Sequence, residues 1–133
     1  MKKIFVILCL SILFMGMGGI NEDETKLPKL KENIRLEITD LDGYQIILEN
    51  ASIADHAYIS GNAGRGKQIV ELNKIRKVDI KPLSEKEVTA EIILKNNEVI
   101  KLTLNGNQKL KGRSRFGVYS VKVSDIKRVV FLD

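Results

Sequence analysis

From Asn33 onward, apolar and polar residues alternate along most of the chain. Ile34, Leu36 and Ile38 fall on one face of an extended segment, and the residues between them are polar or charged. A period of two is typical of strands that bury one face, and β-branched residues, which favour strands, are frequent here. Because no long stretch carries the 3.6-residue period of an amphipathic helix, the pattern predicts an all-β fold.

Two short turns are predicted between pairs of these segments. Asp42-Gly43 lies between the strand-like runs 34–40 and 44–50, and Asp-Gly is a strong signal for a two-residue hairpin. Asn96-Asn97 joins the runs 88–95 and 98–104 in the same way, because Asn tolerates a left-handed backbone. Further glycines predict loops at Gly61, Gly64, Gly66, Gly106, Gly112 and Gly117.

The chain also contains a candidate internal repeat. Residues 70–80 align with residues 121–131 at an offset of 51, with the shared order strand, polar pair, isoleucine, basic pair, strand. A one-turn link is expected within each copy, at 73–76 and 124–127. We therefore expect two similar tandem units, about 34–81 and 88–132, joined by residues 82–87.

Each unit is expected to contain two long strands, a less regular middle, a third strand, the one-turn link and a last strand. A short turn before the closing strand is similar to the SH3-like small barrel; this resemblance rests on strand order and covers no functional motif. A unit of about 48 residues buries little apolar surface alone, so two barrels packed together are expected. One pseudo-symmetric β-sandwich is the alternative.

The N-terminal residues 1–18 have the pattern of a secretory signal peptide. Two lysines precede a continuous apolar run over residues 4–15, as in the charged and apolar regions of such signals. Small residues follow at Gly16, Gly18 and Gly19. We expect cleavage after Gly18 and export to the periplasm or the extracellular space. Residues 19–32 then form a flexible spacer before the all-β domain, 33–133.

An uncleaved membrane anchor is the alternative for this segment. Counted to Ile20, the apolar run is 17 residues long, at the lower edge of what can span a bilayer. Cleavage would leave 115 of the 133 residues and lower the formal charge from +5 to +3, because Lys2 and Lys3 are lost. It would also remove Cys9, the only cysteine, so that no disulfide or thiolate remains.

Two segments mimic ligand-binding loops. Residues 61–68 nearly match G-x-x-x-x-G-K-[ST], but Gln68 stands where a hydroxyl should bind Mg²⁺, and strand-like residues follow where the motif needs a helix. A hairpin loop is expected instead. Residues 40–43 resemble part of a calcium loop, but the first ligand position would be Ile38. A plain hairpin is again expected.

No catalytic set, metal site or cofactor site is expected. His56 is the only histidine, and Asp55 would point to the opposite face of a strand. A zinc site at His56 would need three carboxylates, which is unusual, so we expect a surface histidine. The enzyme alternative is a hydrolase that uses scattered acids such as Asp55, Glu71 or Asp125.

The candidate binding residues are basic. Four cations recur at every second position before Phe116 and Tyr119, and the corresponding loop of the first unit carries two more. These six are Lys109, Lys111, Arg113, Arg115, Arg65 and Lys67. Alternate positions share one face of a strand, so they are expected to bind an anionic polymer or a protein partner. Lysines on an edge strand also block unwanted pairing, which is the structural alternative.

These features predict an exported, non-catalytic β module that binds another component of the cell envelope, either a protein or an anionic polymer. Nucleic acid is not expected as a partner, because the charge is only mildly positive and the chain is expected to be exported. Membrane contact is expected only if the N-terminal segment stays uncleaved. The alternative is a structural or assembly protein that forms a homo-oligomer, or pairs with a partner sheet, through its strand edges.

Overall fold

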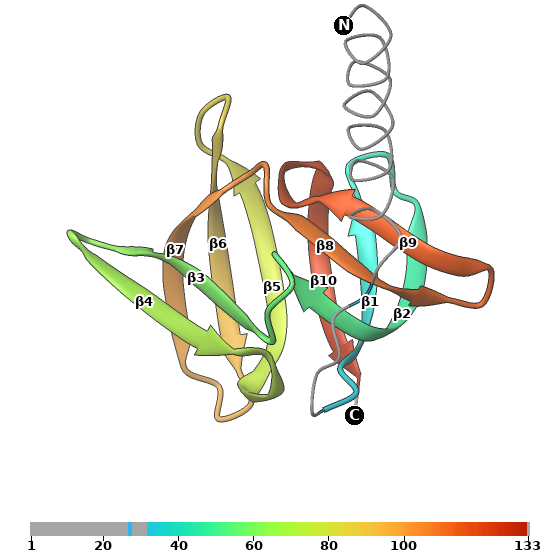
Figure 1. Ribbon diagram of the computed structural model, residues 1–133. Coiled ribbons are helices and arrows are strands. Elements are labelled where there is room, and N and C mark those ends of the chain that lie inside the picture. The colour runs from blue at the N-terminus through green and yellow to red at the C-terminus, as the bar shows by residue number, and fades with distance from the viewer. Residues whose placement is uncertain (1–26, 28–31, 133) are drawn as a thin grey trace, which may run out of the picture.

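The computed structural model describes residue 27 and residues 32–132, which form an antiparallel β fold (Figure 1). The all-β class predicted from the sequence is confirmed, whereas the predicted signal peptide lies outside the described residues. The elements are β1 (Arg35–Asp40), β2 (Gln45–Ile53), β3 (Tyr58–Ala63), β4 (Gly66–Glu71), the one-turn 3-10 helix η1 (Leu72–Lys74), β5 (Ile75–Pro82), β6 (Glu87–Leu94), β7 (Val99–Asn105), β8 (Lys109–Ser114), β9 (Gly117–Lys122), the one-turn 3-10 helix η2 (Val123–Asp125) and β10 (Ile126–Leu132).

All ten strands belong to one curled sheet with the order β4-β3-β7-β6-β5-β10-β1-β2-β8-β9. The order is pseudo-symmetric about the β5–β10 pair. Strands at equal distances from the centre differ by five in number, as β4 and β9 do at the two edges. Val78 of β5 pairs with Val129 of β10 at the centre. Figure 1 shows the two curled halves, with β3–β7 on the left and β1, β2 and β8–β10 on the right.

The strand pairing differs from the expected closure of each unit on itself. The β1–β2 hairpin pairs with β10 and β8, whereas the β6–β7 hairpin pairs with β5 and β3. We call β1–β5 the first segment of the chain and β6–β10 the second segment. The half with β3, β4 and β5 therefore contains the β6–β7 hairpin of the second segment, and the half with β8, β9 and β10 contains the β1–β2 hairpin of the first segment. Alternating apolar residues mark where strands lie, but both hairpins present the same kind of apolar face. The pattern alone therefore cannot show which hairpin joins which half.

Hydrogen bonds at the two hairpin turns follow the same exchange. Leu41 N donates to the Asp125 carbonyl oxygen at 3.0 Å, and Lys95 N donates to the Lys74 carbonyl oxygen at 2.9 Å. Each turn is thus bound to the 3-10 helix of the other segment. Left-handed residues close both turns, Gly43 with φ 86° and Asn97 with φ 71°. The two hairpins predicted from the sequence are confirmed.

Four glycines predicted to lie in loops belong to strands: Gly66 and Gly117 are the first residues of β4 and β9, and Gly61 and Gly112 lie inside β3 and β8. A Cβ atom on Gly112 would be 2.7 Å from Leu48 Cβ, and one on Gly61 would be 2.8 Å from the Thr103 carbonyl oxygen. Gly61 and Gly112 therefore each permit a close approach of strands where the sheet curls. A glycine in a sequence marks a special position without telling a turn from such an approach.

The core is aliphatic and runs through both halves of the sheet. Leu36 and Ile38, which the alternation placed on one face, are fully buried. The same core takes in residues from the central strands and from both exchanged hairpins, among them Leu48, Ile75, Val78, Ile92, Leu102, Ile126 and Val129. Since this burial excludes apolar surface from water in both halves together, neither segment completes its core without the other.

Splitting the chain tests this exchange. Fragments 32–84 and 85–133 each keep five strands but lose the hairpin that completes their half, so neither is expected to fold as a monomer. Mixing the two fragments is expected to restore the dispersed amide NMR spectrum of the intact chain. A dispersed spectrum from either fragment alone, at the size of a monomer in gel filtration, would contradict the exchange.

The close approach at β8 is tested by Gly112→Ala. The added methyl group would overlap Leu48, and such overpacking costs about 1–3 kcal/mol in the free energy of unfolding. Gly66→Ala is the matched control, since the nearest atom to its Cβ is the Ala63 carbonyl oxygen at 3.8 Å, and a change within about 0.5 kcal/mol is expected. Chemical denaturation followed by circular dichroism measures both, and equal losses would argue against the close approach.

Candidate functional site

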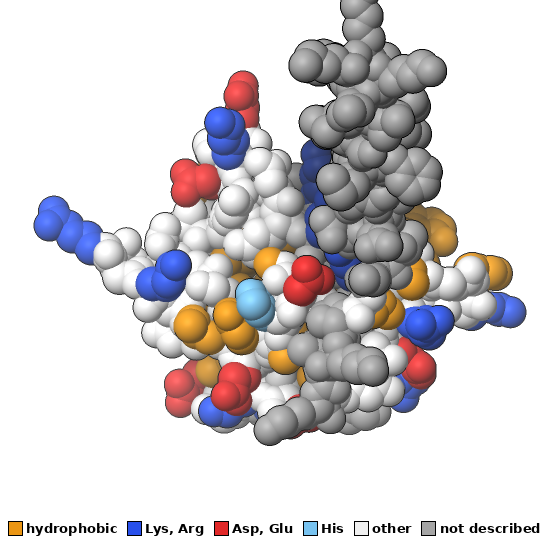
Figure 2. All heavy atoms as spheres, viewed as in Figure 1, with side chains coloured by type: hydrophobic (Ala, Val, Ile, Leu, Met, Phe, Trp, Pro, Cys, Tyr) orange, Lys and Arg blue, Asp and Glu red, His pale blue; other side chains and the backbone are white. Residues whose placement is uncertain are grey.

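A groove of about 580 Å³ lies between the β1–β2 hairpin and the tip of the β8–β9 hairpin. We call it the aromatic–basic groove and define it by Tyr44, Ile47, Arg113, Arg115 and Phe116. Figure 2 shows apolar and basic side chains together at the end of this hairpin, on the right of the molecule. The groove thus combines an apolar surface with positive charge.

Aromatic side chains are concentrated at this end of the fold. Residues 32–132 contain five aromatic residues, and three of them are here: Tyr44, Phe116 and Tyr119. The ring centroids of Tyr44 and Tyr119 are 6.4 Å apart. Phe116 is 81% exposed, Tyr44 51% and Ile47 49%. Apolar surface left open in one place marks an interaction site more often than scattered exposed residues do.

The tip of the β8–β9 hairpin is held by hydrogen bonds of Ser114. Its hydroxyl accepts from Phe116 N at 3.1 Å and donates to the Gly117 carbonyl oxygen at 3.0 Å. The Arg115 guanidinium carbon lies 5.2 Å from the centroid of the Phe116 ring, within the range of a cation–π contact. These hydrogen bonds fix the backbone of the turn from which the Phe116 and Arg115 side chains project.

Acidic residues line the groove along β1 and β2. Glu37 and Glu49 both line it, and Glu49 Oε1 lies 3.5 Å from Arg35 Nε. The positive charge comes from the hairpin side, where Arg113 and Arg115 are exposed. The groove therefore has a polarity, acidic along β1 and β2 and basic along the β8–β9 hairpin, and the two charges meet where Glu49 and Arg113 are register partners.

The six cations predicted to bind a partner do not form one site. Arg113 and Arg115 line the aromatic–basic groove. Arg65 and Lys67 are exposed on the β3–β4 hairpin, which projects on the opposite side of the molecule (Figure 1). Lys109, at the start of β8, is half-buried. Strand alternation correctly placed these residues on strands and turns but did not show how far apart the two hairpins lie.

Lys111 is buried, although the alternation placed it on an open face. Its residue exposure is 8%, and its Nζ lies 3.8 Å from Asp55 Oδ1. Ser52 is its register partner across β2 and β8, and the Ser52 hydroxyl is buried with no hydrogen-bond partner among the described residues. The link between β2 and β3 brings Asp55 to this strand, a contact that the sequence pattern does not reveal.

The other candidate segments have the structures expected of plain hairpins and loops. Residues 61–68 fall in the β3–β4 hairpin, whose turn is Gly64-Arg65. The Asp40 side chain accepts hydrogen bonds from Asp42 N and Tyr44 N, both at 2.9 Å, within the β1–β2 turn. His56 is exposed and stacks on Tyr58 with centroids 4.7 Å apart.

Residue 27 and residues 32–132 contain no group of three or more His, Cys, Asp or Glu placed to hold a metal ion. The same residues contain no helix long and apolar enough to cross a membrane. The acids Asp55, Glu71 and Asp125 line neither the aromatic–basic groove nor the second groove described next.

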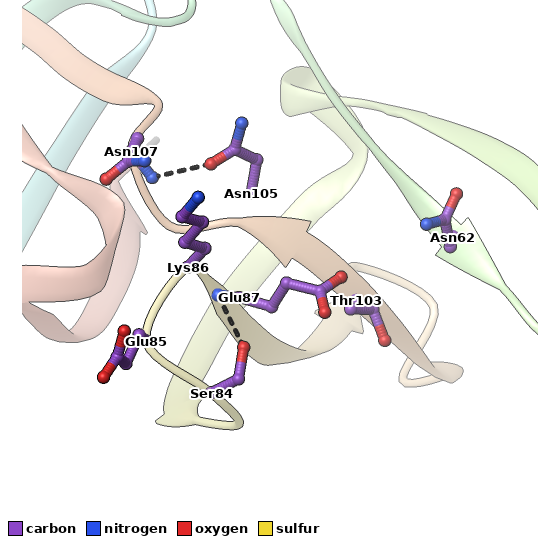
Figure 3. A pocket seen from close by; sticks show the side chains of 8 residues that line it. All are labelled: Asn62, Ser84, Glu85, Lys86, Glu87, Thr103, Asn105 and Asn107. Atoms are coloured by element: carbon purple, nitrogen blue, oxygen red, sulfur yellow. Dashed lines mark hydrogen bonds between the residues drawn. The ribbon is translucent and has the colours of Figure 1, made fainter.

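The second groove, of about 660 Å³, lies in the other half of the molecule (Figure 3). Its lining is polar: Asn62, Ser84, Glu85, Lys86, Glu87, Thr103, Asn105 and Asn107. Asn62 and Thr103 are register partners, as Arg113 and Glu49 are in the aromatic–basic groove. The two grooves therefore share this one pair of corresponding positions. The rest of their linings differ, and aromatic side chains line only the aromatic–basic groove.

The arginines of the groove could be named from the sequence, but the apolar surface beside them could not. Tyr44 follows the Asp42-Gly43 turn, and Ile47 is the one of two adjacent isoleucines that faces outward. A turn residue such as Phe116, apolar and between an arginine and a glycine, was the available signal. Only the pairing of β2 with β8 brings the three residues together.

Tyr119 lies behind the groove, on the inner face of β9. Burial raises the pKa of its phenol above the usual 10.0, and the nearby Asp40, Tyr44 and Asp125 raise it further. The phenol is therefore held in its neutral form. Its surroundings belong to the β1–β2 turn and to η2, so Tyr119 helps to close this half of the sheet.

The raised pKa of Tyr119 predicts a loss of stability at alkaline pH. The favourable neutral form is fully present below pH 10, and its contribution disappears as the pH rises from the unfolded value through the higher folded value. Between pH 9 and pH 11, the melting temperature of the wild type is expected to fall further than that of Tyr119→Phe, because phenylalanine cannot ionise. Equal losses in the two proteins would show that Tyr119 does not contribute.

Comparison with known proteins assigns the chain to a family. Neither the curated proteins nor the solved structures contain a match. A protein-family model described as "Uncharacterised protein" matches residues 29–133, which include every strand described above and both grooves. The match covers far more than half of the chain, and the chain belongs to this family of uncharacterised proteins.

Proposed function

We propose that the chain is an exported, non-catalytic β module that binds another component of the cell envelope, a protein or an anionic polymer, through the aromatic–basic groove. The N-terminal sequence pattern supports export. The groove supports binding, because its exposed Tyr, Phe and Arg side chains are the types enriched at protein interfaces. The turn held by Ser114 adds to this, since a backbone fixed in advance loses less entropy on binding.

The single observation that carries the proposal is the difference between the two hairpins. β3 and β4 recur 51 residues later as β8 and β9, so Phe116 corresponds to Arg65 and Ser114 to Ala63. The β3–β4 tip has neither an aromatic ring nor a hydroxyl to order the turn. A purely structural need for the hairpin would apply to both tips equally, so the extra features of one tip favour a role in recognition.

We also propose that the two halves are SH3-like units built from a repeated segment. Each half combines a hairpin with three further strands, as in β10-β1-β2-β8-β9, and has a one-turn 3-10 helix before the central strand. The elements from β3 to β5 recur at an offset of 51 as β8 to β10. The pairing of Ile38 with Ile46 recurs as Ile92 with Ile100. These correspondences support a duplication with exchanged hairpins.

The alternative function is assembly through strand edges. β4 and β9 are the outer strands of the sheet and each pairs on one side only, so their other edges can accept a further strand. This alternative requires a stable homo-oligomer or a partner sheet. It differs from groove binding in the contact surface, because the edges lie along β4 and β9 and the groove lies between hairpins.

Photocrosslinking in cells that produce the chain tests the proposed function. A photoreactive residue replaces Phe116 in one variant and Arg65, its counterpart on the other hairpin, in the control. We expect one partner other than the chain itself to be captured at position 116 and not at position 65. Equal capture at both positions would contradict binding through the groove, and capture only of further copies of the chain would favour assembly.

A further inference from the structure

We infer that the partner is a polypeptide whose binding segment places an apolar side chain against Tyr44, Ile47 and Phe116 and a neighbouring carboxylate on Arg113 and Arg115. This inference rests on the proposed function and names the class of partner for the same groove. It follows from three features of the groove: its open apolar surface, the polarity of its charges, and the contrast between its hairpin and the β3–β4 hairpin.

The apolar part of the segment is indicated by what the groove leaves open. Phe116 is mostly exposed, and Tyr44 and Ile47 are about half exposed. All three line one groove. Covering such surface is favourable because it releases water from apolar groups. A single aliphatic or aromatic side chain of a partner contacts this surface, whereas a polymer that carries only charged groups gains nothing from it.

The acidic part of the segment is indicated by the charge of the hairpin. Residues 99–124 contain six Lys or Arg and no Asp or Glu, and the two arginines at the groove are on this stretch. Arginine binds a carboxylate through two parallel N–H donors. Glu49, the register partner of Arg113, lies 3.5 Å from Arg35 Nε and so is already paired with a cation other than the two arginines of the groove.

The polarity of the groove also fixes the orientation of the segment. Glu37 and Glu49 would repel a carboxylate placed over β1 and β2, so the partner's acid lies toward Arg113 and Arg115. Its apolar residue then lies between Ile47 and Phe116. An acid separated from the apolar residue by one or two positions fits this arrangement.

The contrast between the hairpins favours a polypeptide over an anionic polymer. Arg65 and Lys67 are exposed at the tip of β3–β4 without an aromatic residue beside them, and a polyanion held by charge alone would bind there too. The aromatic ring and the ordered turn distinguish the β8–β9 tip. Recognition of an apolar side chain next to a carboxylate uses both features of that tip.

Selection from a display library tests the inference. The protein used is residues 19–133, the form expected after cleavage of the signal peptide. Phage that display random 12-residue peptides are selected on the protein, and enriched peptides are then synthesised with a fluorescent label. We expect enriched peptides to carry an apolar residue within two positions of Asp or Glu. Failure to enrich peptides, or enrichment of peptides without an acid, would overturn the inference.

Matched variants show whether such peptides use the groove. Phe116→Ala and the double variant Arg113→Glu, Arg115→Glu are each expected to weaken peptide binding about tenfold or more, the loss typical of a central interface residue. The double variant Arg65→Glu, Lys67→Glu changes the same charge on the other hairpin, and binding within about twofold of wild type is expected. Equal weakening by both double variants would overturn the inference.

Two further measurements separate this inference from the proposed function. Phe116 is exposed, so Phe116→Ala is expected to keep the wild-type melting temperature, and Phe116→Tyr is expected to keep most of the peptide affinity.

Titration with polyphosphate tests the other class of partner, an anionic polymer. Polyphosphate binding that is lost in the variant Arg113→Glu, Arg115→Glu and kept in the variant Arg65→Glu, Lys67→Glu, together with no peptide binding, would overturn the polypeptide partner and leave binding of an anionic polymer to the groove in place.

Discussion

The exchange of hairpins between the two segments is the constraint on which the rest of the structure depends. β5 and β10 join the halves at the centre of the sheet, and β1–β2 and β6–β7 each cross to the half that is centred on the other segment. A half with its hairpin missing would expose the apolar face of three strands to water. The turns of the exchanged hairpins are hydrogen-bonded to the opposite 3-10 helices through Leu41 N and Lys95 N. These bonds hold the exchanged hairpins in register.

The inner and outer faces of the sheet follow different rules under this constraint. Inward positions remain apolar in both halves, as Leu48 and Leu102 do at corresponding places against the two strand glycines. Outward positions differ, as Phe116 and Arg65 do at the two tips. Because the core depends on the inward side chains, the outward ones are free to differ in chemistry without loss of the fold. The aromatic–basic groove is built entirely on such outward and turn positions.

The sequence predicted the strands, the two hairpin turns and the one-turn links because each depends on local patterns. Alternation places Leu36 and Ile38 in the core, and Gly43 and Asn97 supply the left-handed turns. Strand pairing is not local, and the close approaches at Gly61 and Gly112 depend on it. The same limit explains the site: Arg113 and Arg115 could be named from the sequence, while Tyr44 and Ile47 join them only through the pairing of β2 with β8.

The row of cations along β8 shows how one pattern serves two purposes. At Lys111 the strand passes beneath the link that carries Asp55, and the charge is buried beside a carboxylate. A buried charge is tolerated only when it is paired, so Lys111 constrains the packing of β8 against that link. At Arg113 the strand still pairs with Glu49 of β2, but the side chain is exposed and lines the groove. Depth along the hairpin, rather than residue type, therefore separates the structural cation from the cation available to a partner.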